Sequence, residues 1–305
     1  MELRWDEVAT ARPRDPADPA DPAYAWPAHV ADAVQQAGAN GMEVALQLRG
    51  TPRWANGGRP PRWAPRKAQD FGTFAAAASR RFPAVRRWIV WGEPSKRANF
   101  LVAGVPRRGP SYQHQVPRAY ARMLDAAYAG LKSVNPANLV IGGNTYTVGD
   151  IRAPAFIRAM RLRSGRPPRL DLYGHNAFTL RRPDLAQPSA LPGVVDFSDL
   201  DTLASLIDAN LGRTPTGRRI PIYIPEFTLP TDHSNWEFNF WVSRRVQADW
   251  LARALAIVRS SPRIVTLGWL SLYDDPPRPR HDEVARGLID YHGKRKPAFY
   301  AFARG

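Results

Sequence analysis

Residues 88–94 of the chain read WIVWGEP, and residues 220–227 read IPIYIPEF. Both are short apolar runs that lead into a glutamate, Glu93 in the first and Glu226 in the second. Neither run alternates apolar with polar residues, which is the pattern of a parallel strand buried on both faces. The two stretches therefore indicate a parallel sheet in which two strands end in a carboxylate.

Other short apolar runs have the same character, and they occur at residues 42–48, 139–142, 170–173 and 264–272, with a shorter one at 2–5. Between them, apolar residues recur every three or four positions, the period of an amphipathic helix. This pattern predicts helices over residues 120–131, 200–211 and 246–258. Ser198 and Asp201 have the spacing of a capping box at the start of the second of these helices.

Strands that alternate with helices at this spacing predict parallel βαβ units. A length of 305 residues favours a closed (β/α)₈ TIM barrel, which takes roughly 250 residues. A doubly wound sheet is the alternative, but the chain lacks the G-x-G-x-x-G turn that such sheets often carry. We expect one domain over residues 1–305.

The composition excludes several classes of protein. Hydrophobic residues at 44% and charged residues at 23% are typical of a folded chain. The absence of cysteine excludes disulfides, cysteine nucleophiles and thiolate metal sites. The six histidines are scattered without metal-ligand spacing, so we expect neither a metal nor another cofactor. We expect no membrane span, because no run of 18 apolar residues exists. The charged start at residues 1–6 predicts no signal peptide in this chain. The localisation stays open, and secretion is one alternative if the true N-terminus lies upstream.

The chain carries 43 Lys and Arg against 27 Asp and Glu, a net charge of +16. Such a balance raises nucleic acid as a partner. Nearly all of the positive charge is arginine, and it is spread along the chain without forming one basic arm. We therefore expect no specific nucleic-acid partner, and adhesion to polyanions stays an alternative.

Active sites of (β/α)₈ barrels lie at the C-terminal ends of the strands, where Glu93 and Glu226 are expected. If two carboxyl groups face each other there, their repulsion raises the pKa of one above that of the other. The group with the higher pKa can then act as a general acid, and the ionised group as a nucleophile. For either glutamate alone, an ion pair with one of the many arginines is the alternative. The pair at two strand ends favours catalysis.

Several segments resemble one known family, the retaining barrel glycoside hydrolases of clan A, which include cellulases and β-xylosidases. Trp91-Gly92-Glu93-Pro94 resembles the acid/base motif on the fourth strand of that clan. Ile224-Pro225-Glu226-Phe227 resembles the nucleophile motif on the seventh. Further similar segments follow in the same order over nearly the whole chain: residues 47–55, 171–176, 268–269, 287–290 and 296–298.

The resemblance implies a retaining O-glycosyl hydrolase that acts on an oligosaccharide or polysaccharide by a two-carboxylate double displacement. Glu93 would be the general acid/base and Glu226 the nucleophile. The implied substrate-binding residues are His175, Asn176, Trp54, Trp269, Asn144, Tyr146 and Trp236. For His175 the alternative is a structural histidine. For Asn144 and Tyr146 it is a plain turn, and for Trp54 and Trp269 it is a buried packing role.

Two departures from the family pattern are visible. Gly92 stands where the family has an asparagine whose amide contacts the sugar 2-hydroxyl, so asparagine there is expected to raise activity. The first β/α unit of the family has no counterpart, so we expect a barrel that lacks this unit or has it truncated, with residues 2–5 as a short second strand. Both departures favour an alternative function, a catalytically weak or inactive carbohydrate-binding barrel.

Overall fold

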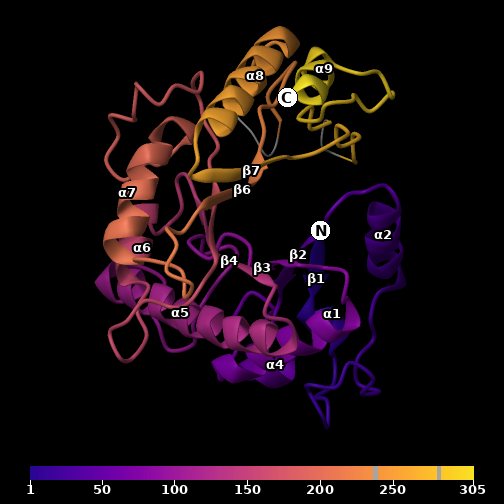
Figure 1. Cartoon of the computed structure of the whole chain (residues 1–305), viewed down its shortest axis with the longest axis vertical. Coiled ribbons are helices and arrows are strands. Elements are labelled where there is room, and N and C mark those ends of the chain that lie inside the picture. The colour runs from indigo at the N-terminus through magenta and orange to yellow at the C-terminus, as the bar shows by residue number, and fades with distance from the viewer. Residues whose placement is uncertain (236–239, 280–282) are drawn as a thin grey trace. The chain divides into compact units, whose positions relative to one another are not determined.

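A computed structural model of the chain describes residues 1–235, 240–279 and 283–305, so Trp236 lies outside the described residues. The chain divides into two compact units (Figure 1). The first unit comprises Met1–Gly174 and Leu206–Ile220, and the second comprises His175–Ser205 and Pro221–Gly305. The single domain expected from the sequence stays a prediction.

Strands and helices alternate along both units. The first unit contains β1 (Glu2–Arg4), α1 (Trp5–Val8), α2 (Ala28–Ala39), β2 (Ala45–Arg49), α3 (Arg53–Asn56), α4 (Ala68–Arg81), β3 (Arg87–Val90), α5 (Gly109–Val134), β4 (Leu139–Tyr146) and α6 (Ala153–Ala159). The second contains η1 (Phe197–Asp199), β6 (Ile222–Phe227), α8 (Arg244–Ser260), β7 (Ile264–Trp269) and α9 (Pro297–Arg304). Strand β5 (Leu172–Asn176) and helix α7 (Leu200–Asn210) each contribute residues to both units.

Strands β1 to β4 of the first unit pair in parallel and in chain order. Trp88, Ile89 and Val90 of β3 are all buried, as a strand covered on both faces requires. Strand β2 differs, because Leu46 and Leu48 are buried while the intervening Gln47 is only half-buried. One face of β2 therefore presents polar side chains.

Helices α4 and α5 lie side by side in the first unit (Figure 1). Two glycines allow their close approach, since a Cβ on Gly130 would lie 2.1 Å from the carbonyl oxygen of Gly72. Helix α5 also links the end of β3 to the middle of β4 through Tyr120. Its hydroxyl donates to the Val90 carbonyl at 2.8 Å and accepts from the Gly143 N–H at 2.9 Å. Burial raises the pKa of Tyr120, so the hydroxyl keeps the proton that it donates.

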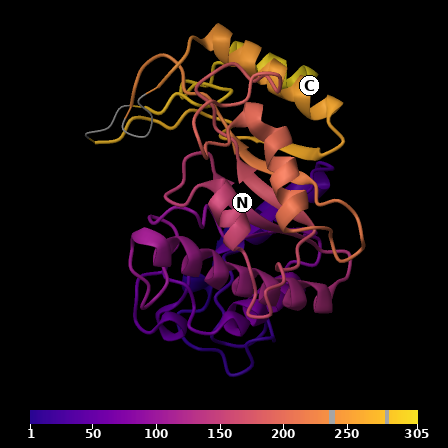
Figure 2. The same ribbon diagram turned by 90° about the vertical axis from the view of Figure 1, so that its left-hand side faces the viewer.

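In the second unit, β6 and β7 pair in parallel, and their register shifts between Ile224 and Phe227. Helices α8 and α9 lie side by side in both views (Figures 1 and 2). Their shared core contains Leu251, Leu288 and Ala298. Beside it, the fully buried ammonium group of Lys296 lies 2.7 Å from the Asp274 carboxylate.

The expected alternation of parallel strands and helices is confirmed. The predicted helices correspond to parts of α5 and α8 and to α7, which ends one residue earlier than predicted, at Asn210. The described residues contain seven strands, and the short strand expected at residues 2–5 is β1. A closed barrel of eight β/α units is not confirmed. The predicted capping box of Ser198 and Asp201 is wrong. Asp196 and Asp199 form it instead, because a 3-10 turn, η1, precedes α7 and moves the first free N–H groups upstream.

Candidate active site

Glu93 follows the C-terminal end of β3 on a strained turn. Trp91 and Glu93 have backbone φ angles of 66° and 44°, in the left-handed region that L-residues rarely adopt. The Trp91 indole packs edge-on against Phe100, with ring centroids 5.2 Å apart, and its N–H donates to the Asn99 carbonyl at 3.0 Å. Such conformations persist only where the surroundings enforce them, and they are frequent at functional sites.

The Glu93 side chain is 14% exposed and has two partners on the turn that follows it. The Asn99 amide donates to Glu93 Oε2 at 3.1 Å, and the Lys96 ammonium lies 2.9 Å from the same oxygen. Lys96 also sits 4.3 Å from the centre of the Tyr146 ring, a cation–π distance. Glu93 therefore forms an ion pair with a lysine three residues further along the chain.

Asn144, on β4, holds the backbone of the Glu93 turn. Its amide donates to the Trp91 carbonyl at 2.7 Å, and its own backbone φ is 42°. The side chain is only 1% exposed and takes the space of a Cβ at Gly174, which would lie 1.7 Å from the Asn144 carbonyl oxygen. Asn144 thus acts on the turn and is covered from solvent, while Tyr146 reaches Glu93 through Lys96.

Gly92 has a neighbour that the sequence did not point to. A Cβ on Gly92 would lie 2.9 Å from Nε2 and 3.1 Å from Oε1 of Gln47, on β2. The Gln47 carboxamide therefore occupies the space next to Gly92. Within the described residues this carboxamide makes no hydrogen bond, so its N–H and C=O groups are available one residue from Glu93.

Glu226 lies on β6 where the pairing with β7 becomes irregular. A Cβ on Gly268 of β7 would lie 2.3 Å from the Pro225 carbonyl oxygen, so only glycine allows this close approach. The Asn176 amide, at the end of β5, donates to Glu226 Oε2 at 3.0 Å. Irregular pairing of this kind re-aims side chains at active sites. The second unit thus holds Glu226 with a neutral hydrogen-bond donor.

His175 precedes Asn176 on β5 and is fully buried. Its Nε2 lies 2.8 Å from the Val195 carbonyl oxygen, and since a carbonyl can only accept, Nε2 carries the proton. His175 therefore fixes the chain around 195 against the strand that presents Asn176. The predicted histidine lies beside the site and is covered by protein.

Two aromatic candidates belong to the second unit. Trp269 ends β7 and is half-buried, with its N–H donating to the Arg286 carbonyl at 3.1 Å. Its ring meets Phe227, the residue after Glu226, edge-on at 5.8 Å between centroids. Trp269 therefore lies close to Glu226. Trp236 lies outside the described residues.

Trp54, on α3 of the first unit, is half-buried among other groups. Its ring meets Trp5 edge-on at 5.4 Å, and its N–H donates to the Ala9 carbonyl at 2.9 Å. The Arg12 guanidinium lies 5.5 Å from the ring centre. These are packing contacts with α1 and the loop after it, and a role in binding sugar stays a prediction.

The structure thus groups Glu93, Asn144 and Tyr146 in the first unit, and Glu226, Asn176, His175 and Trp269 in the second. Over residues 1–235, 240–279 and 283–305, no cluster of His, Asp and Glu could hold a metal ion. No helix in the described part of the chain has both the length and the apolar character of a membrane span.

No family model matches the chain, and neither does any curated protein. Solved structures do. A family 39 glycoside hydrolase from Bacteroides cellulosilyticus WH2 has a TM-score of 0.66 and 18% identity, over 98% of this chain and 55% of that one. A glucosidase from Croceicoccus marinus has a TM-score of 0.62 and 15% identity, over 99% and 60%. A monomeric β-xylosidase from Caulobacter crescentus CB15 has a TM-score of 0.56 and 15% identity, again over 99% and 60%.

The chain shares its fold with glycoside hydrolases. The resemblance to clan A that the motifs indicated is confirmed for the fold, and at these identities the likeness extends to the fold alone. The chain spans between about half and two thirds of the length of these similar structures.

Three residues near Glu93 were missed by sequence reasoning: Lys96, Asn99 and Gln47. The first two lie three and six residues after Glu93 in the segment EPSKRAN, so a tight turn there could have suggested them. Gln47 could have been found from the alternation of β2, because residues 47 and 49 share the face opposite Leu46 and Leu48.

Proposed function

We propose that the chain is a retaining O-glycosyl hydrolase of oligosaccharides or polysaccharides, with Glu93 as general acid/base and Glu226 as nucleophile. The observation that carries the proposal is the placement of these two glutamates. Each lies at the C-terminal end of a parallel strand, in a fold shared with glycoside hydrolases, and each accepts a hydrogen bond from an asparagine amide. Barrel enzymes build their active sites at those strand ends.

In this reaction the Glu226 carboxylate attacks the anomeric carbon while Glu93 gives its proton to the departing glycosidic oxygen. The C–O bond breaks, and a covalent glycosyl ester forms on Glu226. Water then attacks the anomeric carbon, Glu93 takes the proton of that water, and the ester bond to Glu226 breaks. The mechanism requires the two carboxyl groups to lie roughly 5–5.5 Å apart during the reaction.

The other residues would support these steps. Asn176 orients Glu226 through its 3.0 Å hydrogen bond, and Asn144 holds the Glu93 turn through its hydrogen bond to the Trp91 carbonyl. His175 positions the end of β5. Tyr146 and Trp269 are assigned to the sugar, because aromatic rings stack on the C–H faces of pyranose rings and both lie beside a glutamate. We assign Trp54 and Trp236 to the rim on the strength of the sequence resemblance.

Lys96 favours a second candidate function, a barrel that binds carbohydrate without hydrolysing it. A general acid must present its carboxyl group to the glycosidic oxygen, whereas here the Lys96 ammonium group lies 2.9 Å from Glu93 Oε2. Under the hydrolase proposal Lys96 must leave Glu93 when substrate binds. Under the binding proposal it stays.

Two substitutions distinguish these functions when tested on a panel of aryl glycosides and natural oligosaccharides. Glu226→Ala should abolish turnover of every substrate, since no ester can form. Glu93→Ala should slow the hydrolysis of natural glycosides by about 10²–10⁴-fold and spare the first step with activated aryl glycosides. Added azide should then restore turnover of Glu93→Ala and yield the glycosyl azide, because a small anion needs no general base.

Glu43→Ala is the matched control, because Glu43 is an exposed glutamate of the first unit that pairs with Arg87. It should retain the activity of the wild type. The binding function would replace the proposal if the wild type and both variants bind oligosaccharides equally and none hydrolyses any member of the panel.

A further inference from the structure

Basic residues occur throughout the chain, but most of its net positive charge lies in one stretch. Residues 51–109 hold thirteen Lys and Arg against two acidic residues, Asp70 and Glu93, although the net charge of the whole chain is only +16. The stretch includes the loop after β2, helix α4, strand β3 and the loop that carries Glu93.

Part of the charge surrounds a small pocket in the first unit. The pocket has a volume of about 220 Å³, and Arg4, Arg49 and Arg62 line it together with Trp91. Among the residues that the structure describes, no acidic side chain lines this pocket. Arg4 is the last residue of β1, Arg49 is the last residue of β2, and Arg62 lies in the loop after α3. Trp91 belongs to the Glu93 turn. The pocket therefore opens at the strand ends where Glu93 lies.

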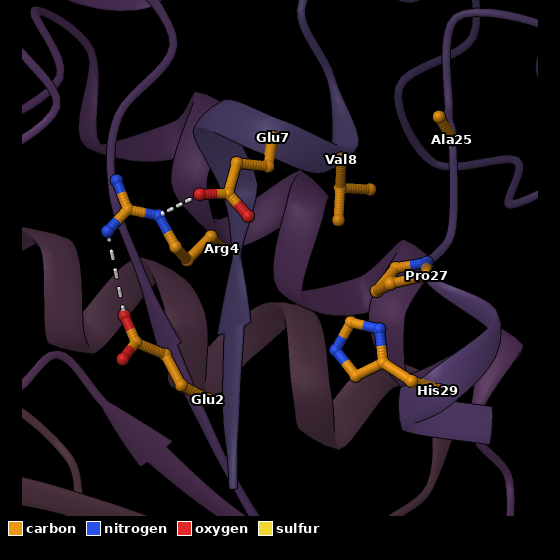
Figure 3. Close-up of a pocket in the computed structure, with 7 residues that line it drawn as sticks. All are labelled: Glu2, Arg4, Glu7, Val8, Ala25, Pro27 and His29. Atoms are coloured by element: carbon orange, nitrogen blue, oxygen red, sulfur yellow. Dashed lines mark ion pairs between the residues drawn. The ribbon is translucent and has the colours of Figure 1, made fainter. Parts of the chain in front are cut away.

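Two of the three arginines are oriented by acids that lie outside this pocket. Arg4 contacts Asp6 at 2.8 Å and Glu7 at 2.7 Å, and Arg49 contacts Glu2 at 3.0 Å. Figure 3 shows Glu2 and Glu7 on either side of Arg4 in a separate pocket of about 360 Å³. The acids thus hold the guanidinium groups in place from one side and leave the other pocket lined by cations.

Arg62 differs from the other two. It is exposed, and its guanidinium group has no ion pair or hydrogen bond within the described residues. A guanidinium group offers five N–H donors in a fixed plane, and here these donors are free to meet a ligand.

An aromatic group extends the cationic surface. The Trp63 ring has Arg59 at 5.3 Å and Arg107 at 5.6 Å from its centre. Its loop is fixed to the one before α5, since the Leu101 N–H donates to the Arg62 carbonyl at 2.9 Å. Trp63, Arg59 and Arg62 are therefore neighbours on one ordered loop.

We infer that this surface, the pocket of Arg4, Arg49 and Arg62 with the Arg59–Trp63–Arg107 group, binds the anionic substituent of an acidic glycan. The inference rests on the hydrolase proposal and names its substrate class. A guanidinium group binds a carboxylate or a sulfate through two parallel hydrogen bonds. The pocket is smaller than a typical ligand site of 300–1,000 Å³, which suits one substituent rather than a stretch of nucleic acid.

The test measures binding of the full chain, by calorimetry at 150 mM salt, to four ligands. These are an oligogalacturonate, a sulfated oligosaccharide, a neutral xylo-oligosaccharide of equal length and a single-stranded DNA. We expect at least one acidic glycan to bind about tenfold or more tightly than the neutral one, from a charge-assisted bidentate contact. The two acidic arms distinguish a uronate from a sulfate ester.

Arg62→Ala should weaken acidic-glycan binding by about ten- to a hundredfold and leave binding of the neutral glycan unchanged. Arg62→Lys should recover only part of the loss, because an ammonium group cannot bind bidentately. Arg118→Ala is the control, since Arg118 is an exposed arginine on α5, about 13 Å along the helix from its start. It removes the same charge and should change nothing.

Equal binding of neutral and acidic glycans would overturn the inference. So would equal losses in Arg62→Ala and Arg118→Ala, or DNA binding tighter than that of either acidic glycan, which would indicate a nucleic-acid surface. If neutral aryl glycosides are hydrolysed and no acidic glycan binds, the inference fails and the hydrolase proposal stands. If an acidic glycan binds in a manner that depends on Arg62 and no glycoside is hydrolysed, the inference stands and the hydrolase proposal fails.

Discussion

Replacing Lys296 with methionine should destabilise the folded chain by about 3–5 kcal/mol, because it leaves a buried carboxylate without its counter-charge. The Lys296 ammonium is fully buried and donates to Asp274 at 2.7 Å, to Thr231 at 3.1 Å and to the Ala285 carbonyl at 3.2 Å. Asp274 keeps one other partner, the Gly287 N–H at 2.6 Å. Its second oxygen is buried with no hydrogen bond within the described residues.

Removing the charge of Asp274 as well should recover most of the loss. In the Lys296→Met/Asp274→Asn variant the new carboxamide would still accept from the Gly287 N–H, so no buried charge and no orphaned backbone group remains. We expect this variant to lie within about 1–2 kcal/mol of the wild type. The matched control is Lys294→Met, an exposed lysine two residues away, which should change stability by less than about 0.5 kcal/mol.

The pH dependence gives a second readout. Burial raises the pKa of Asp274 above its usual 3.8, while the Lys296 ammonium opposes that rise. An acid with a raised pKa in the folded state binds its proton more tightly there, so stability falls as pH rises from the unfolded to the folded pKa. Lys296→Met removes the opposing ammonium and raises the pKa of Asp274 further. The deficit of Lys296→Met should therefore be largest at neutral pH and shrink toward pH 4.

The assay is equilibrium unfolding in urea, followed by circular dichroism and by tryptophan fluorescence at pH 4, 5.5 and 7.5. Coincident transitions by the two probes would justify converting the midpoints into free energies. A loss of less than about 1 kcal/mol in Lys296→Met at pH 7.5 would show that the unpaired Asp274 carboxylate costs little. A double variant no more stable than the single one would show the same.

Two further substitutions concern the surroundings of Glu93. Lys96→Met should raise the turnover of natural glycosides about two- to fivefold relative to activated aryl glycosides, because Glu93 no longer pairs with an ammonium group. The measurement is the ratio of the two kcat values. An unchanged ratio would show that Lys96 does not affect protonation of the leaving group. Gly92→Asn places its Cβ 2.9 Å from Gln47 Nε2, so it should gain less activity than Gly92→Asn/Gln47→Ala, where the space is free. Comparing kcat/KM of the two variants tests this, and equal values would count against the role of Gln47.

The strands and helices could be predicted because apolar period and length are local properties of the sequence. The segments around Trp88–Val90 and Ile222–Ile224 are buried on both faces, and their composition shows it directly. The apolar run at residues 42–48 predicted the start of a strand too early, because β2 begins only at Ala45 and Met42 is 60% exposed. A mainly apolar sequence does not by itself show that one face of this strand presents the polar side chains Gln47 and Arg49.

The candidate glutamates could be predicted because each ends a strand, but their partners could not. Lys96 and Asn99 reach Glu93 only because the turn takes positive φ at Trp91 and Glu93, a conformation that neither residue type favours. Asp274 and Asp275 are adjacent in sequence but have different partners, since Asp274 pairs with Lys296 and Asp275 with Arg286.

The closing motif Lys296-Pro297-Ala298 acquires a physical reason from this structure. Its lysine pairs with Asp274 inside the second unit, and its alanine enters the core between α8 and α9. The motif therefore concerns stability, and its presence says nothing about catalysis. Lys96 bears on catalysis more directly, because its ammonium group lies 2.9 Å from Glu93 Oε2. Loss of the Lys296 charge should therefore change stability, whereas loss of the Lys96 charge should change turnover.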